Sequence, residues 1–132
     1  PLYCTGEVEG KIRKTFSYAF DHEVEGLARG WVPNLCFRRI DETPFEVLGE
    51  SVTPIALQHA QFDVFGFRIR DVAYCSDVSE IPRRSWPRLE GLKVLVIDAL
   101  RYRLHPAHFG LNEALDVIAK FRPEKAYLTH MS

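Results

Sequence analysis

Cysteine is scarce in this sequence of 132 residues, which has three copies, at positions 4, 36 and 75. An odd number of widely spaced cysteines without a CxxC pair excludes the dense disulfide framework of small secreted domains, so we expect free thiols. An excess of charge is also missing, because 17 Lys and Arg stand against 18 Asp and Glu. The net charge of −1 removes the electrostatic case for nucleic acid or an anionic membrane as the main partner.

Long apolar runs are missing as well. The longest mostly apolar stretch, residues 92–100, is too short to cross a bilayer and includes Lys93 and Asp98. The GxGxxG, GxxxxGK[ST] and GxSxG motifs are absent, so dinucleotide binding, a phosphate-binding P-loop and a serine nucleophile elbow have no support. With 46% hydrophobic and 27% charged residues, the composition is typical of one globular domain, and we expect a cytoplasmic protein.

The first 34 residues are predicted to contain a strand, a helix and a long loop. A short apolar piece at 1–4 predicts the strand. The helix is predicted over 7–20, where apolar residues recur every four positions at Val8, Ile12, Phe16 and Phe20. The charged residues of this helix, Glu9 and Arg13 among them, are expected on a solvated face. Glycine and proline interrupt residues 21–34, where we expect the loop.

The middle of the chain is dominated by strand patterns. Short β-branched and aromatic runs, each bounded by turn residues, predict strands at 37–40, 45–48, 52–57, 62–69 and 72–75. Pro54 lies within one of these runs and indicates an edge strand or a bulge.

The last third is predicted to be a strand, helix, strand unit. Residues 92–97 form an almost continuous apolar run, which is typical of a strand covered on both faces. Apolar residues at intervals of three and four then predict an amphipathic helix that begins at Leu111 and ends near Arg122, because Pro123 follows. A final strand is expected at 126–129. This order after a β-rich middle predicts the α/β class, with residues 1–132 in a single domain.

Imidazole and carboxylate groups gather where the expected strands end. His59, Asp77 and His130 each follow or close a strand. In layered α/β proteins ligands bind at the carboxyl ends of strands, and these groups suit Zn and other divalent metals. The carboxylate would bridge two ions, with one imidazole for each. The alternative is structural, with His59 in a surface loop, Asp77 capping a turn and His130 hydrogen-bonded at the sheet end.

Three more residues flank these candidates. His105 and His108 lie in the loop before Leu111, where a histidine near a helix N-terminus can contact a phosphate oxygen or protonate a leaving group. For His105 a solvated position is favoured. Asp98 ends a buried strand, so we expect it to accept hydrogen bonds from the backbone or a histidine. Asp98 and His105 thus remain candidates that support the site or touch the substrate.

Three motifs, in this order, resemble those of the metallo-β-lactamase-fold hydrolases. They are YCSDVSEIP at 74–82, DALR at 98–101 with HPAHF at 105–109, and LTHMS at 128–132. The resemblance is nearest to the phosphoribosyl cyclic phosphodiesterase branch of the carbon–phosphorus lyase pathway, with tRNA 3′-processing endonucleases as more distant cousins. It implies part of an αββα sandwich.

The resemblance also implies roles for single residues. His59, Asp77 and His130 match metal ligands, with Asp77 bridging, and His108 matches a histidine that contacts phosphate and assists proton transfer. Two divalent ions, Zn or Mn, would hold a hydroxide that attacks a small (cyclic) phosphodiester. The alternative is a non-catalytic binding or scaffold domain of the same fold that has lost the metal site.

The sequence departs from the family in one respect, because the HxHxDH loop that supplies most metal ligands is missing. We expect this loop and the first β-layer upstream of Pro1, which makes residues 1–132 a C-terminal portion. Such a portion alone should be inactive as a hydrolase, since each ion loses most of its protein ligands. An incomplete sandwich also favours association, so a homodimer is expected.

Overall fold

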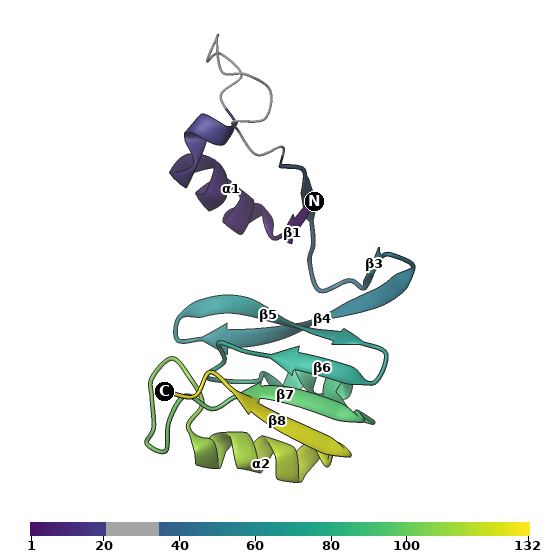
Figure 1. The fold of residues 1–132 in the computed structure, drawn as a ribbon, viewed down its shortest axis with the longest axis vertical. Coiled ribbons are helices and arrows are strands. Elements are labelled where there is room, and N and C mark those ends of the chain that lie inside the picture. Colours follow the sequence, from purple (N-terminus) through teal and green to yellow (C-terminus); the bar gives the residue numbers. More distant parts are fainter. Residues whose placement is uncertain (21–34) are drawn as a thin grey trace. The chain divides into compact units, whose positions relative to one another are not determined.

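The computed structural model describes residues 1–20 and 35–132, which form two compact units. The first unit is Pro1–Asp41 and the second is Glu42–Ser132 (Figure 1). The loop predicted at 21–34 lies outside the described residues. No helix in the described ranges has the length and apolar composition needed to cross a membrane.

The first unit is a strand, helix, strand arrangement. Strand β1 (Leu2–Cys4) pairs in parallel with β2 (Phe37–Arg39), and helix α1 (Gly6–Thr15) follows β1. Thr5 caps this helix, because its side chain accepts a hydrogen bond from the Val8 amide at 3.3 Å. The helix predicted over 7–20 is confirmed only in part. It ends at Phe16, whose φ of −114° is not helical, and the chain continues as the short 3₁₀ turn η1 (Ser17–Ala19).

The prediction that Glu9 lies on a solvated face is wrong. Its side chain is buried and accepts hydrogen bonds at 2.8 Å from Nε of both Arg13 and Arg39. Val8 and Phe16, which belong to the predicted apolar stripe, are instead exposed. An acidic side chain is buried here because two guanidinium groups, one from α1 and one from β2, meet it.

The second unit contains a six-stranded mixed sheet. Its order follows the chain: β3 (Phe45–Val47), β4 (Glu50–His59), β5 (Phe62–Ile69), β6 (Val72–Cys75), β7 (Val94–Asp98) and β8 (Lys125–Thr129). Strands β3 to β6 are antiparallel neighbours, while β7 and β8 run parallel to β6. The strands predicted from the sequence are therefore confirmed, and β4 extends further at both ends than its apolar run indicated.

Pro54 occupies an edge position although β4 has neighbours on both sides. Strand β3 pairs only with residues 50–52, so no strand among the described residues pairs with the far side of Pro54. Its carbonyl instead accepts a hydrogen bond from Arg88. The missing amide hydrogen of proline therefore costs no ladder hydrogen bond.

Two helical segments cover one face of this sheet. They are the 3₁₀ segment η2 (Arg83–Leu89) and helix α2 (Leu111–Phe121), which lies along β7 and β8 in Figure 1. Leu95 and Ile97 of β7 are fully buried beneath them, together with Ala114 of α2. Helix α2 is confirmed, with Arg122 in the left-handed conformation at its C-terminus (φ 47°), just before Pro123. The segment η2 is not apparent from apolar spacing.

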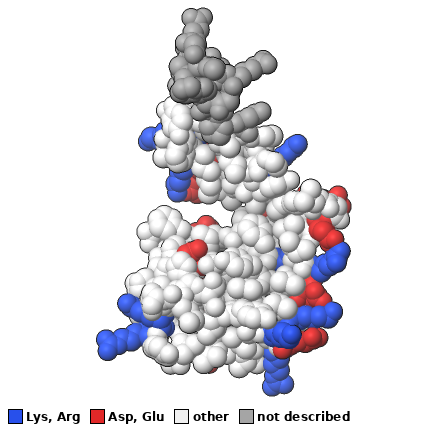
Figure 2. Space-filling model, viewed as in Figure 1, with Lys and Arg blue, Asp and Glu red and all other residues white. Residues whose placement is uncertain are grey.

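The opposite face of the sheet is apolar and more exposed. Ile69, Val72, Tyr74 and Tyr127 on this face are between 42% and 54% exposed. The strand predicted to be covered on both faces is thus fully buried on one face only, and Val94 and Val96 are half-buried within this unit. In the view of Figure 2, residues other than Lys, Arg, Asp and Glu fill much of the centre of the part formed by residues 42–132, and most of the charged groups lie toward its margins.

Candidate functional site

The sheet topology brings four strand ends to one edge. Strands β6, β7 and β8 are parallel, and β4 shares their direction because it is separated from β6 by one antiparallel strand. His59 is the last residue of β4 and Asp98 the last of β7. Asp77 follows β6 by two residues, and His130 follows β8 directly. Residues that are far apart in the sequence therefore meet at the carboxyl edge.

Two of these residues have an uncommon backbone conformation. Asp77 has a φ of 54° and His130 a φ of 63°, both in the left-handed region that side-chain-bearing residues seldom adopt. Each lies just beyond a strand, where this conformation turns the chain away from the sheet. The two side chains face each other, with Nε2 of His130 3.8 Å from Oδ1 of Asp77.

Hydrogen bonds fix the ring orientation of two histidines. Nδ1 of His59 lies 2.7 Å from the carbonyl oxygen of Ala107, and Nδ1 of His108 lies 2.7 Å from Oδ2 of Asp98. Both partners are acceptors, so each Nδ1 carries a proton and donates it. The Nε2 atoms of His59 and His108 then hold lone pairs, which a metal ion or a proton can occupy.

His108 lies at the centre of the cluster. Ligand atoms of His59, Asp77 and His108 all lie within 4.8 Å of one another, and so do those of Asp98, His108 and His130. The ring centroid of His108 is 4.6 Å from that of His59 and 4.7 Å from that of His130, with the latter pair stacked. The structure thus brings the predicted residues together.

Asp98 lies at the base of this cluster and is fully buried. Its Oδ2 accepts hydrogen bonds from His108 and from the amide of Val78, at 3.2 Å. Its Oδ1 has no hydrogen-bond partner among the described residues, although it is buried. Burying an unpaired carboxylate oxygen is costly, so the site favours a cation or a further donor nearby.

The donor set fits a divalent first-row metal. Imidazole nitrogens and carboxylate oxygens are the ligands that zinc and manganese accept, and catalytic zinc sites use three protein ligands. His59, Asp77 and His130, which belong to the two groups around His108, are side chains of this kind. The unpaired, buried oxygen of Asp98 adds negative charge that a bound cation would neutralise.

His105 is not the solvated loop residue that the sequence favoured. It is half-buried, and its Nδ1 accepts a hydrogen bond from the amide of Ala107 at 3.2 Å. Burial, followed by the positive charge of Arg101, lowers the pKa of His105 below its usual value. Its ring centroid lies 5.3 Å from that of His108. His105 is therefore a neutral neighbour of the cluster.

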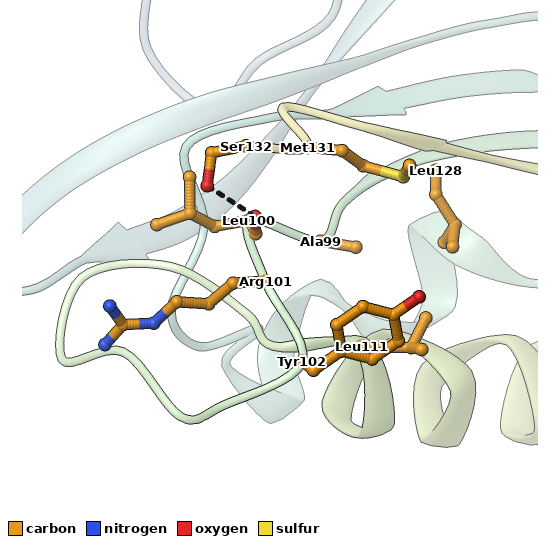
Figure 3. A pocket seen from close by; sticks show the side chains of 8 residues that line it. All are labelled: Ala99, Leu100, Arg101, Tyr102, Leu111, Leu128, Met131 and Ser132. Atoms are coloured by element: carbon orange, nitrogen blue, oxygen red, sulfur yellow. Dashed lines mark hydrogen bonds between the residues drawn. The ribbon is translucent and has the colours of Figure 1, made fainter.

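A small pocket lies on the chain segments that follow Asp98 and flank His130 (Figure 3). It has a volume of about 180 Å³ and is lined mainly by apolar side chains: Ala99, Leu100, Arg101, Tyr102, Leu111, Leu128, Met131 and Ser132. Figure 3 shows the Arg101 side chain extending along its own loop, where Nη2 donates to the Leu104 carbonyl at 2.9 Å. An apolar surface therefore adjoins the polar cluster.

The prediction that Asp98 accepts hydrogen bonds from the backbone or a histidine is confirmed, but the sequence did not show which backbone groups organise the site. The Ala107 carbonyl and the Val78 amide hold His59 and Asp98, yet alanine and valine have no polar side chain to draw attention. The loop that carries Ala107 is itself held in place, because the Phe109 amide donates to the Val78 carbonyl at 2.7 Å. No residue type or spacing signals such contacts.

Comparison with known proteins adds a family and several relatives. The model of the beta-lactamase superfamily domain matches residues 1–131. A crystal structure of a diphosphatase from the PhnP family superposes on 100% of this chain with a TM-score of 0.85 and 30% sequence identity. The chain covers 47% of that diphosphatase, or about half of its length.

Two further proteins are similar over shorter or more divergent stretches. Human tRNase Z, short form, has a TM-score of 0.66 at 16% identity, over 98% of this chain and 60% of its own, which shows a shared fold. An octanoyltransferase of Porphyromonas gingivalis is 29% identical over 92 residues, which are 69% of this chain but 19% of that protein.

Proposed function

The chain belongs to the beta-lactamase superfamily, and on this basis we propose that it supplies part of the active site of a metal-dependent phosphodiesterase. One observation carries the proposal: imidazoles and carboxylates from four strand ends and one loop lie together around His108. The 30% identity to a diphosphatase over the whole chain supports phosphorus chemistry. Since the chain spans about half of that relative, the activity and substrate of the whole protein belong to the proposal.

His59, Asp77 and His130 would hold the metal. When bound, two divalent ions supply Lewis-acid polarisation of the phosphoryl group and a nucleophile derived from water. Zinc and manganese both suit this donor set. These three residues alone offer one imidazole for each ion and one shared carboxylate, so we propose that the rest of the coordination comes from outside residues 1–132.

His108 would donate a proton to the leaving group. Asp98 holds Nδ1 at 2.7 Å, so Nε2 is the ring atom available for proton exchange. Once Nε2 is protonated, His108 can donate that proton to the leaving oxygen, and the Asp98 carboxylate stabilises the imidazolium before transfer. This assigns His108 the catalytic role and Asp98 the task of orienting it.

The substrate class is proposed from these groups and from the relatives. We propose a small phosphodiester, cyclic or linear, in a cytoplasmic enzyme that associates as a homodimer. The match to an octanoyltransferase makes an octanoyl thioester the compound to compare, because that similarity covers 69% of this chain. A scaffold domain that has lost the metal site remains the alternative, and it predicts neither metal binding nor turnover.

The test uses the full-length protein, with bound metal measured by elemental analysis and hydrolysis measured on bis(p-nitrophenyl) phosphate and octanoyl-CoA. His59→Ala, Asp77→Ala and His130→Ala should each lose metal and phosphodiester turnover. Asp116→Ala is the matched control, because this carboxylate is exposed on α2. Unchanged metal content in all three site variants would contradict the proposal. Faster hydrolysis of octanoyl-CoA than of bis(p-nitrophenyl) phosphate would show that the substrate is a thioester and not a phosphodiester.

A second arm tests whether the site is partial. Residues 1–132 expressed alone should bind metal weakly and show no phosphodiester turnover, because each ion lacks ligands. Turnover by this segment at the rate of the full-length protein would contradict the proposed sharing of the site.

A further inference from the structure

The backbone of Ala107 makes hydrogen bonds to two histidines, as a donor to one and as an acceptor from the other. The Ala107 amide donates to Nδ1 of His105 at 3.2 Å, while the Ala107 carbonyl lies 2.7 Å from Nδ1 of His59. An amide hydrogen can only be donated, and a carbonyl oxygen can only accept. One residue without a functional side chain therefore determines which nitrogen carries the proton in two rings.

The two rings then present different atoms at their far ends. Nδ1 of His59 must carry a hydrogen to reach the carbonyl, so Nε2 of His59 holds a lone pair. Nδ1 of His105 must be unprotonated to accept the amide hydrogen, so a neutral His105 carries its hydrogen on Nε2. His59 is thus prepared to bind a cation, whereas His105 is prepared to donate a hydrogen bond.

His105 lies beside the ring that is assigned to proton transfer. Its ring is half-buried and lies 5.3 Å, centroid to centroid, from His108, the residue assigned to the leaving group. Burial, and then the positive charge of Arg101 on the same loop, lowers the pKa of His105, which favours the neutral ring. A ring nitrogen that bears hydrogen cannot coordinate a metal, so the chemistry of His105 differs from that of its neighbours.

We propose that His105 is a further substrate-binding residue, which donates a hydrogen bond from Nε2 to a non-bridging oxygen of the phosphodiester. The inference rests on the proposed function and adds a residue that recognises the phosphate rather than the metal. A hydrogen bond to a charged oxygen is among the stronger ones in proteins. Because this hydrogen bond already forms when the substrate binds, its loss should raise KM more than it lowers kcat.

Two variants of His105 separate substrate binding from a role in loop structure. In His105→Asn the short amide can still accept from Ala107 but cannot reach the place of Nε2. In His105→Gln the longer amide can place a donor there. With bis(p-nitrophenyl) phosphate and the full-length protein, we expect His105→Asn to raise KM by about 10- to 100-fold. His105→Gln should stay within about fivefold of the wild type.

The reverse order would overturn the inference. If His105 served only to hold the loop, His105→Asn would be the milder change and His105→Gln the more harmful one. Equal KM values for wild type and His105→Asn would also overturn it while leaving the proposed function intact. Absence of hydrolysis by the wild type would instead overturn the proposed function, which keeps the two failures distinguishable.

Nuclear magnetic resonance gives a test that needs no turnover. In zinc-loaded full-length protein with ¹⁵N-labelled histidine, long-range ¹H–¹⁵N correlations report which ring nitrogen is protonated. We expect hydrogen on Nε2 of His105 and on Nδ1 of His59, and a shift of the His105 Nε2 signal when inorganic phosphate is added. Hydrogen on Nδ1 of His105, or no shift with phosphate, would contradict the inference.

Discussion

Oδ2 of Asp98 lies 2.7 Å from Nδ1 of His108, while Oδ1 of the same carboxylate is buried without a hydrogen-bond partner in the described part of the chain. This contact joins the buried Asp98, at the base of the cluster, to His108 at its centre. The amide of Val78 completes the contact to Oδ2 at 3.2 Å. The carboxylate therefore orients His108 and provides the charge that stabilises its protonated form.

We predict that Asp98→Asn lowers kcat for phosphodiester hydrolysis by about 100-fold. The amide oxygen can still accept from Val78, so the fold should persist, but a neutral side chain no longer stabilises a positively charged His108. Steady-state kinetics and circular dichroism of the full-length protein measure the two effects. Asp116→Asn, on the exposed side of α2, is the control, and an unchanged kcat in Asp98→Asn would contradict the role of this pair.

Gly66→Ala should destabilise the sheet, because Gly66 of β5 has no room for a side chain. A Cβ atom there would lie 2.8 Å from the Tyr74 carbonyl oxygen and 2.9 Å from Cδ1 of Leu57. The carbonyl belongs to the neighbouring strand and cannot move without disturbing the ladder. We expect the free energy of unfolding to fall by about 1–3 kcal/mol in urea denaturation.

The control for this substitution is Gly10→Ala in helix α1, where an added Cβ atom meets nothing within 4 Å. Alanine is the better helix former, so this variant should be neutral or more stable by up to about 1 kcal/mol. Equal free energies of unfolding for wild type and Gly66→Ala would contradict this prediction, because they would show that β6 can shift away from β5 at little cost.

Most of the fold was predictable because apolar spacing decides which residues form each element. The alternation in β5 and the periodicity of α2 are local, so both elements were identified from sequence. The burial of Glu9 was not, because it depends on Arg39, which is 30 positions away. The left-handed conformations of Asp77 and His130 were not predicted either, although aspartate and histidine adopt this region more often than most residues.

The candidate site also has features that the local sequence indicates and features that depend on distant residues. Histidine and aspartate at strand ends could be identified from the sequence, since parallel strands present their carboxyl ends at one edge. The contact between His59 and Ala107 spans 48 positions and uses a backbone carbonyl, so no pattern of side chains could indicate it. Sequence thus predicts which side chains are available, and tertiary structure determines which ring nitrogens they present.

Thiol reactivity should distinguish the three cysteines. Burial raises the pKa of the Cys75 thiol to about 12 and also raises the pKa of the half-buried Cys4 thiol, whereas Cys36 is exposed. With Ellman's reagent at about pH 8, native protein should release one fast equivalent from Cys36, and Cys75 should react at least about 1,000-fold more slowly until the chain unfolds. Cys36→Ser should remove the fast phase. Rapid labelling of Cys75 in the folded protein would contradict its burial.

The ion pairs of Glu9 should make the first unit sensitive to acid. Hydrogen bonds from Arg39, and then from Arg13, hold the pKa of the Glu9 carboxyl below its usual range. A carboxyl whose pKa is lower in the folded state stabilises the protein above its unfolded pKa of about 4.3, and this contribution disappears as the pH falls through the folded pKa. Glu9→Gln should therefore lower protection of α1 amides from hydrogen exchange near neutral pH, and the difference from wild type should vanish in acid.

Glu7→Gln removes only an exposed pair with Lys11 and should have little effect. A difference for Glu9→Gln that persists at low pH would show that packing, rather than charge, anchors this side chain.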